Sequence, residues 1–97
     1  MKYSLETNNN LVSVIMPVHN AQDYLSETVN SVLCQTYKNL EIILVDDASS
    51  DSSRKLIQKY ERLDERVKSV LLDENCGVAN ARNEGIKKAK GRFIAFL

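Results

Sequence analysis

The chain has 97 residues, of which 43% are hydrophobic and 27% charged, the composition of one small globular domain with a single core. Thirteen Lys and Arg residues balance thirteen Asp and Glu, which argues against a dedicated nucleic-acid surface, because such a surface needs a basic excess. Cys34 and Cys76 stand apart without C-x-x-C spacing, so we predict reduced thiols rather than a disulfide framework or a zinc site.

Residues 1–10 contain three consecutive Asn and no apolar stretch, so we predict a flexible tail rather than a signal peptide or a membrane anchor. The sequence nowhere reaches the run of about 18 apolar residues that a membrane-spanning helix requires. Together these features predict a cytoplasmic protein whose folded part is residues 11–97.

Four short apolar runs, rich in Val, Ile and Leu, predict β-strands that are covered on both faces. They lie at residues 11–16, 41–45, 67–72 and 92–97. Pro17 is expected to end the first strand, because proline has no N–H to donate to a central ladder.

The segments between these runs carry helical patterns. Asn20 is the predicted N-cap of the first helix, with Asp23 three residues later as a capping-box acid. The apolar positions of this helix recur at three- and four-residue steps, at Ala21, Tyr24, Leu25, Val29, Val32 and Leu33. Asp51 or a neighbouring serine is expected to cap the second helix, whose predicted buried side holds Leu56, Ile57, Tyr60 and Leu63.

A third helix is predicted over residues 78–90, after a turn at 75–77. Its small residues Ala81, Gly85 and Ala89 would let the helix pack close to the sheet. Gly91 is the predicted C-cap, and three lysines near the helix end suit the helix dipole.

The order βαβαβαβ predicts the α/β class, with a doubly wound, mostly parallel sheet and right-handed crossovers. The loops after the first three strands should then converge at the carboxyl edge of the sheet, where open α/β sheets bind ligands. Because no turn signal follows the last strand, we expect residues 11–97 to be an incomplete domain.

A pair of acids, Asp46 and Asp47, stands directly after the second apolar run, so two carboxylates are held at this edge. A dinucleotide-dependent oxidoreductase is excluded, because the turn at 17–20 lacks the glycines that let a pyrophosphate approach a helix. A receiver-like phosphoacceptor signalling domain and a non-catalytic interaction module stay open as alternatives.

Four sequence blocks, taken in order along the chain, distinguish between these classes of function. They are residues 12–20, 31–37, 41–51 and 75–83, and together they closely resemble the nucleotide-binding half of family 2 glycosyltransferases, the inverting enzymes of the GT-A fold. The resemblance extends over about residues 11–97. It implies a Rossmann-like GT-A donor-binding half that is truncated at its C-terminal end.

The resemblance implies a role for several loop residues. Asp47 would accept the N3–H of uracil, with a turn carboxylate as the alternative role, while Asp46 would support the loop. Residues Pro17, Val18 and His19 would run beside the base, with His19 stacking on it where many family members carry tyrosine; a plain polar turn residue is the alternative.

The resemblance also implies a diphosphate contact. Arg82 would pair with the diphosphate, with a solvated surface arginine as its alternative, and Asn75 and Gly77 would shape the loop that brings it in. Ala48 stands where the family commonly has glycine, so a loop that needs positive φ there would be strained.

By the same resemblance, the parent protein transfers a sugar from a nucleotide-sugar donor, commonly a UDP-sugar, to an acceptor hydroxyl with inversion. The Asp-x-Asp motif that holds Mg²⁺ or Mn²⁺ is expected beyond Leu97, as is the catalytic base, so this chain carries no metal or catalytic residue of its own and should be inactive alone. Polysaccharide, lipid-linked and protein acceptors all remain open.

The expected setting is cell-envelope polysaccharide biosynthesis, with the parent protein at the inner face of the cell membrane as a peripheral protein. An apolar last strand that is left unpaired is also a route to self-association.

Overall fold

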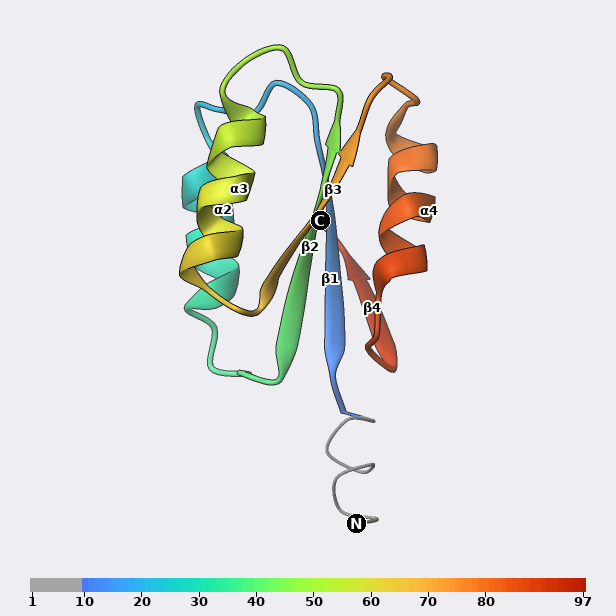
Figure 1. The fold of residues 1–97 in the computed structure, drawn as a ribbon. Helices are drawn as coiled ribbons and strands as arrows, with labels where there is room; N and C mark the ends of the chain where they lie inside the picture. The colour runs from blue at the N-terminus through green and yellow to red at the C-terminus, as the bar shows by residue number, and fades with distance from the viewer. Residues whose placement is uncertain (1–9) are drawn as a thin grey trace.

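The computed structural model describes residues 10–97 as one sheet covered by helices on both faces (Figure 1). The elements are β1 (Val12–Val18), α2 (Leu25–Leu33), β2 (Leu40–Asp47), α3 (Ser53–Leu63), β3 (Val67–Leu72), α4 (Val78–Lys88) and β4 (Phe93–Phe96). The four strands are parallel, in the order β3-β2-β1-β4. This confirms the predicted fold class. The predicted tail at 1–10 lies almost wholly outside the described residues.

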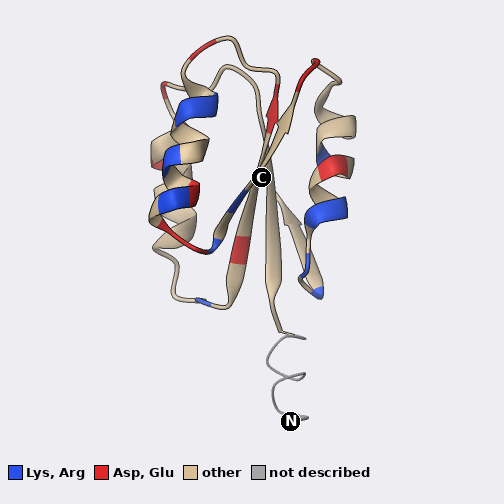
Figure 2. Cartoon of the chain, in the orientation of Figure 1, with Lys and Arg blue, Asp and Glu red and all other residues tan. Residues whose placement is uncertain are grey.

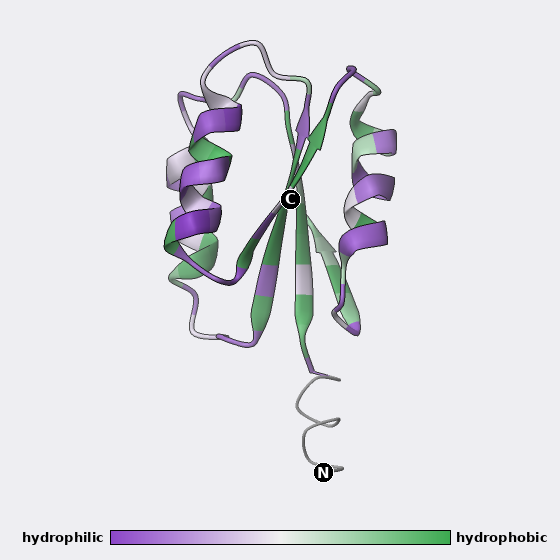
Figure 3. Cartoon of the chain, in the orientation of Figure 1, coloured by the Kyte–Doolittle hydropathy of each residue, from purple (hydrophilic) through white to green (hydrophobic). Residues whose placement is uncertain are grey.

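Burial on both faces explains why the strands read as continuous apolar runs. Helices α2 and α3 cover one face of the sheet and α4 covers the other (Figure 1). All of β2 is buried, with Ile42 and Leu44 in the cluster beneath α2 and α3, and Ile43 and Val45 in the cluster beneath α4. Figure 3 shows the resulting hydrophobic strands between helices that are hydrophilic on their outer sides.

The predicted end of β1 is wrong. The strand continues through Pro17 to Val18, which pair in register with Val45 and Asp46 of β2. The Leu97 N–H donates to the Ile15 carbonyl, so the odd-numbered residues of β1 bond toward β4, and the bonds to β2 do not involve the N–H of position 17. A missing N–H is therefore not costly there.

The predicted start of α2 is also wrong. Asn20 takes a left-handed conformation with φ 51°, and α2 begins at Leu25 after Tyr24, with no side-chain cap at that position. Asp23 is therefore not a capping-box acid. The Asn20 side chain instead reaches the loop after β2, a contact across thirty residues of sequence.

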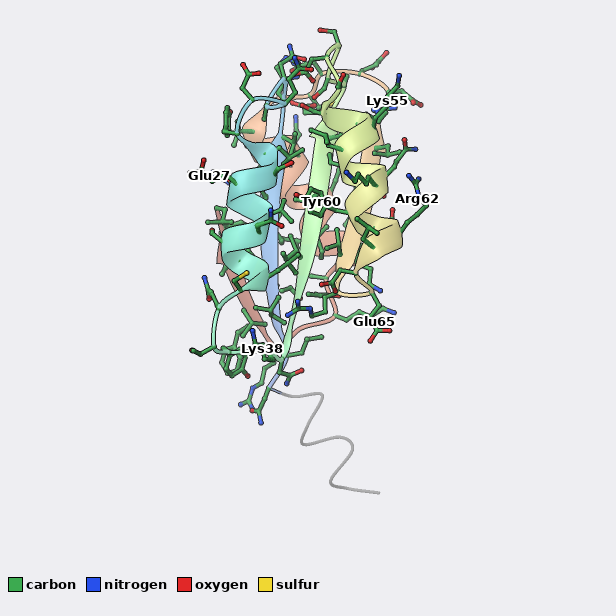
Figure 4. All side chains as sticks on the ribbon, turned by 90° about the vertical axis from the view of Figure 1, so that its left-hand side faces the viewer. Glu27, Lys38, Lys55, Tyr60, Arg62 and Glu65 are labelled. Atoms are coloured by element: carbon green, nitrogen blue, oxygen red, sulfur yellow. The ribbon has the colours of Figure 1, made fainter. Side chains whose placement is uncertain are left out.

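Helix α3 matches its predicted pattern except at its end. Ile57 is buried and Leu56 and Tyr60 pack partly against the core, whereas Leu63 is 70% exposed in the last turn. Figure 4 views this face of the molecule, with Tyr60 between α2 and α3. Ser52 is the N-cap without a side-chain bond, and the Asp51 carboxylate accepts the Ser53 N–H at 2.8 Å.

Helix α4 packs closely on the sheet, as its small residues predicted. Ala81 and Gly85 are buried, and a Cβ added to Gly85 would lie 2.5 Å from Cγ2 of Ile15. The helix ends at Lys88 with Ala89 as C-cap, so Gly91 is not the C-cap.

Gly91 is needed for a close approach instead. A Cβ there would lie 2.5 Å from Oγ of Ser13, which accepts the Gly91 N–H at 2.8 Å. Ser13 in turn donates to the buried Glu41 carboxylate at 2.6 Å, and the same oxygen accepts the Lys90 N–H at 2.7 Å. This buried group fixes the corner between α4 and β4 to the sheet.

Candidate functional site

The loops after β1, β2 and β3 meet at the carboxyl edge of the sheet, where several acidic residues gather (Figure 2). The chain moves from β1 through β2 to β3 and then returns to place β4 on the other side of β1. The strand order therefore reverses at β1, the position at which doubly wound sheets bind ligands. Within residues 10–97 these loops enclose no pocket, so the candidate site is an open ledge.

Asp47 joins the second and third loops. One carboxylate oxygen accepts the Cys76 N–H at 2.7 Å and the other accepts the Gly77 N–H at 3.0 Å, and the residue is only 4% exposed. Each carboxylate oxygen has a second acceptor position, so Asp47 can hold the loop and still accept a further hydrogen bond. Its turn contact is to the loop at 75–77, not to the serine-rich loop that follows it.

Asp46 supports the loops from beneath, as predicted. Its side chain is fully buried, and one oxygen accepts from the Ser49 N–H at 3.2 Å and from Nε of Arg54 at 2.9 Å. The same Arg54 guanidinium donates to the Leu72 carbonyl at the end of β3. Arg54 therefore ties the ends of two strands together, while the second oxygen of Asp46 has no hydrogen-bond partner among residues 10–97.

Asn20 and Asp51 hold the serine-rich loop against the loop after β1. The Asn20 amide oxygen accepts the Ser50 N–H at 2.8 Å, and its backbone N–H donates to the Ser49 hydroxyl at 2.9 Å. Slight desolvation acts to raise the pKa of Asp51, but hydrogen bonds from Ser53 and Gln22 outweigh it and hold the pKa below 3.8.

Ala48 adopts φ 56° in this loop, which confirms that the position needs the left-handed conformation in which the family commonly has glycine. Gly77, in the facing loop, has φ 87°. Both loops therefore turn sharply at residues that directly follow or directly contact Asp47.

His19 is fixed at the edge of the ledge. Its Nδ1 lies 2.7 Å from the Asp47 carbonyl oxygen, so Nδ1 carries the hydrogen and Nε2 is left as an acceptor. The Asn75 amide nitrogen lies 3.3 Å from Nε2, and the Asn20 amide nitrogen lies 3.4 Å from it. The same Asn75 nitrogen lies 3.4 Å from Nδ1, so the amide lies against one face of the exposed ring.

The remaining predicted residues lie on the same edge. Pro17 and Val18 end β1, with Val18 buried at 1% exposure, so its backbone rather than its side chain is the group available to a ligand. Arg82 lies on the second turn of α4, is exposed, and stacks over the Phe96 ring with its Cζ 5.6 Å from the centroid.

Asn20, Arg54 and the serines of the loop are site residues that the sequence analysis missed. An acidic pair after a buried strand, followed eight residues later by an arginine on the next helix, was the available signal for Arg54. No pattern in the neighbouring sequence indicates that Asn20 belongs to the site, because its partner lies thirty residues away along the chain.

The carboxylates of the ledge do not fit a divalent metal. Asp46 and Asp47 are buried and already accept N–H groups from the protein, and residues 10–97 contain no cluster of three His, Cys, Asp or Glu side chains arranged for an ion. These two carboxylates are therefore not assigned as ligands of a catalytic metal.

The sequence profile of one family, Glycosyl transferase family 2, matches residues 13–97. The chain belongs to this family. It is 52% identical over 87 residues to TuaG of Bacillus subtilis, a glycosyltransferase named for teichuronic acid biosynthesis, in an alignment covering 90% of this chain and 34% of TuaG. It is 46% identical over 87 residues to WfgD of Escherichia coli, a UDP-Glc:alpha-D-GlcNAc-diphosphoundecaprenol beta-1,3-glucosyltransferase, with the same coverage. The chain thus spans about a third of the length of these relatives.

Solved structures agree with this assignment. TarS 1-349 of S. aureus superimposes with a TM-score of 0.80 at 32% identity, over 89% of this chain and 26% of that one. The same protein in complex with UDP gives a TM-score of 0.78. A mannosyltransferase of Pyrobaculum calidifontis, solved with GDP-Man and Mn2+, superimposes with a TM-score of 0.70 at 27% identity, over 80% of this chain and 24% of that one.

Proposed function

We propose that this chain is the donor-nucleotide-binding half of a glycosyltransferase that takes its sugar from a UDP-sugar. The observation that carries the proposal is the ledge itself, where the Asp47 carboxylate, the exposed His19 ring and the Arg82 guanidinium share one edge of the sheet. An acceptor, a stacking surface and a cation are the three groups that a uridine diphosphate needs.

Each group matches one part of the ligand. Uracil presents an N3–H donor, and the Asp47 carboxylate is an acceptor held at the end of a buried strand. The backbone of Pro17 and Val18 runs beside the base, His19 stacks on its face, and Asn75 holds the imidazole in place. Arg82 carries a positive charge, and the first turn of α4 is the positive end of the helix dipole, so both suit the diphosphate.

The rest of the activity follows as a proposal for the whole protein. An acceptor hydroxyl attacks the anomeric carbon with inversion, and a base outside residues 1–97 removes its proton. Mg²⁺ or Mn²⁺, bound by an Asp-x-Asp motif also outside this chain, would neutralise the leaving nucleotide. TarS is solved with UDP and with UDP-GlcNAc, which supports a UDP-sugar donor.

The proposed acceptor is a glycan or a lipid-linked glycan of the cell envelope, since WfgD is named for a diphosphoundecaprenol acceptor. We propose that the parent protein works in the cytoplasm at the inner face of the membrane. Residues 10–97 contain no helix that is both long and apolar enough to cross a bilayer. Strand β4, whose four residues are all exposed, supports a second proposal, self-association through its free edge.

An NMR titration of the chain tests donor binding. UDP, with or without Mg²⁺, is expected to shift the amides of His19, Asp47 and Arg82, and GDP is expected to shift them less. If no nucleotide moves these amides at millimolar concentration, the assignment of donor binding to this half is wrong.

Arg82→Gln tests the diphosphate contact. The substitution should weaken UDP roughly tenfold, because it removes charge-assisted bonds, and leave binding of uridine unchanged. Arg92→Gln is the matched control, since Arg92 also stacks on a phenylalanine of β4, with Cζ 5.5 Å from the Phe93 centroid, but at the opposite end of the strand. Equal losses in the two variants would contradict the role of Arg82.

A further inference from the structure

The charges of this neutral chain are unevenly placed. Residues 84–92 hold four cations, Lys87, Lys88, Lys90 and Arg92, against one acid, Glu84, a net charge of +3. Because the whole chain has a net charge of zero, the rest of it carries −3. Helix α3 is different: its segment 51–65 holds four cations and four acids.

A fifth cation joins this group from the sheet. Lys68 pairs in register with Ile43, which belongs to the cluster beneath α4, so Lys68 is directed toward the α4 face. Nζ of Lys88 donates to the Ser69 carbonyl at 3.0 Å, which brings the end of α4 against β3. We name Lys68, Lys87, Lys88 and Lys90 the basic surface; Figure 2 shows blue at the lower part of α4. Arg92 is left out, because it stacks on Phe93, which pairs in register with Val12 of the cluster beneath α2 and α3.

Few acids neutralise the basic surface. Glu84 pairs with Lys87 at 3.0 Å, and both side chains are exposed, so this pair is weak. The Glu41 carboxylate is buried beneath the corner and accepts backbone and hydroxyl hydrogens instead. Apolar side chains lie beside the cations, with Ile86 43% and Ile94 40% exposed.

We propose that the basic surface docks the protein on an anionic lipid membrane. Cations mixed with exposed aliphatic side chains suit a bilayer surface, where ammonium groups meet anionic headgroups and aliphatic groups enter the interface. The proposal rests on the charge distribution and is independent of the donor-binding assignment.

The position of the basic surface on α4 is compatible with an open ledge. Helix α4 has 11 residues, so its basic end lies roughly 16 Å from its start at the ledge. The Debye length is about 8 Å at physiological ionic strength, so the acidic ledge lies outside the range in which the membrane charge repels it. A protein docked in this way keeps the ledge in solvent.

Vesicle sedimentation tests the proposal. The chain is expected to sediment with vesicles of phosphatidylcholine and phosphatidylglycerol and to dissociate from them in high salt. It should not bind vesicles of phosphatidylcholine alone. Each cation near an anionic surface strengthens binding roughly fivefold. The triple variant Lys87→Gln, Lys88→Gln, Lys90→Gln should therefore lose binding by between about tenfold and a hundredfold, the smaller value allowing for the existing partners of Lys87 and Lys88.

A matched variant separates position from net charge. Lys55→Gln, Lys59→Gln, Arg62→Gln removes the same charge from exposed positions of α3 and should keep most of the binding; Figure 4 shows Lys55 and Arg62 on the outer side of that helix. Equal losses in both triple variants, or no binding to anionic vesicles, would overturn the proposal. Binding to a single-stranded RNA oligomer without binding to vesicles would do so as well. Nucleotide titration is unaffected by either result, so this proposal and donor binding fail separately.

Discussion

Replacing Ala48 with glycine should stabilise the protein. Ala48 is held at φ 56°, a region that costs an L-residue about 1–2 kcal/mol. Glycine removes that strain but loses about 0.4–1 kcal/mol through the greater freedom of the unfolded chain. Since Ala48 is only partly buried, little apolar contact is lost, and the free energy of unfolding should rise by roughly 0.5–1 kcal/mol.

Urea unfolding of wild type and Ala48→Gly measures this difference. The midpoint should rise with an unchanged slope, and the melting temperature should rise by roughly 2–8 °C for a domain of this size. Ala79→Gly, at an exposed position of α4, is the control and should lose about 1 kcal/mol. If Ala48→Gly destabilises the protein as Ala79→Gly does, the left-handed conformation at position 48 is not present in solution and the reasoning is refuted.

Three further substitutions test the packing and charges. Gly85→Ala should cost about 1–3 kcal/mol in urea unfolding, because its Cβ would lie 2.5 Å from Ile15 in a closed core; an unchanged midpoint would contradict the close packing. Arg54→Leu should lower the free energy of unfolding by roughly 2–3 kcal/mol, because it leaves the buried Asp46 carboxylate without its cation. The loss is smaller than for a fully buried pair because the Arg54 side chain is a third exposed. The double variant Arg54→Leu, Asp46→Leu should regain stability, which checks this cause. The folded pKa of Asp51 is depressed, so its stabilisation is present above pH 3.8 and is lost as pH falls through the lower folded value. Asp51→Asn should therefore flatten acid unfolding below pH 3.8 in a pH-dependent circular dichroism series, and an unchanged acid limb would count against it.

The alternating fold could be predicted because each strand carries its own signal. Buried strands of a parallel sheet are apolar on both faces, so the runs around Ile43 and Val14 show their position without any knowledge of partners. The small residues of α4 likewise indicated close packing, and Gly85 confirms it.

The errors fall where a residue acts at long range. Asn20 is a residue type that often caps helices, but its side-chain oxygen accepts the Ser50 N–H, and no local sequence pattern can show such a distant partner. Gly91 was predicted from the local rule for helix ends, whereas its real constraint is contact with Ser13 on another strand. The Asp46 and Asp47 pair was found because the two acids interrupt an apolar run, but the division of their roles between Arg54 and the loop at 75–77 required the structure.

The central claim is that Asp47 recognises the base of the donor. A change in the ligand tests it best, because replacing Asp47 would also release the Cys76 and Gly77 amides. The decisive measurement is calorimetric titration of the unmodified chain with UDP and with UDP methylated at uracil N3, which lacks the donor hydrogen. If Asp47 accepts the N3–H of uracil, methylation should weaken binding by roughly tenfold to a hundredfold, the value of a hydrogen bond to a charged group. Equal affinity for the two ligands would show that Asp47 only holds the loop, and would contradict the proposed base recognition.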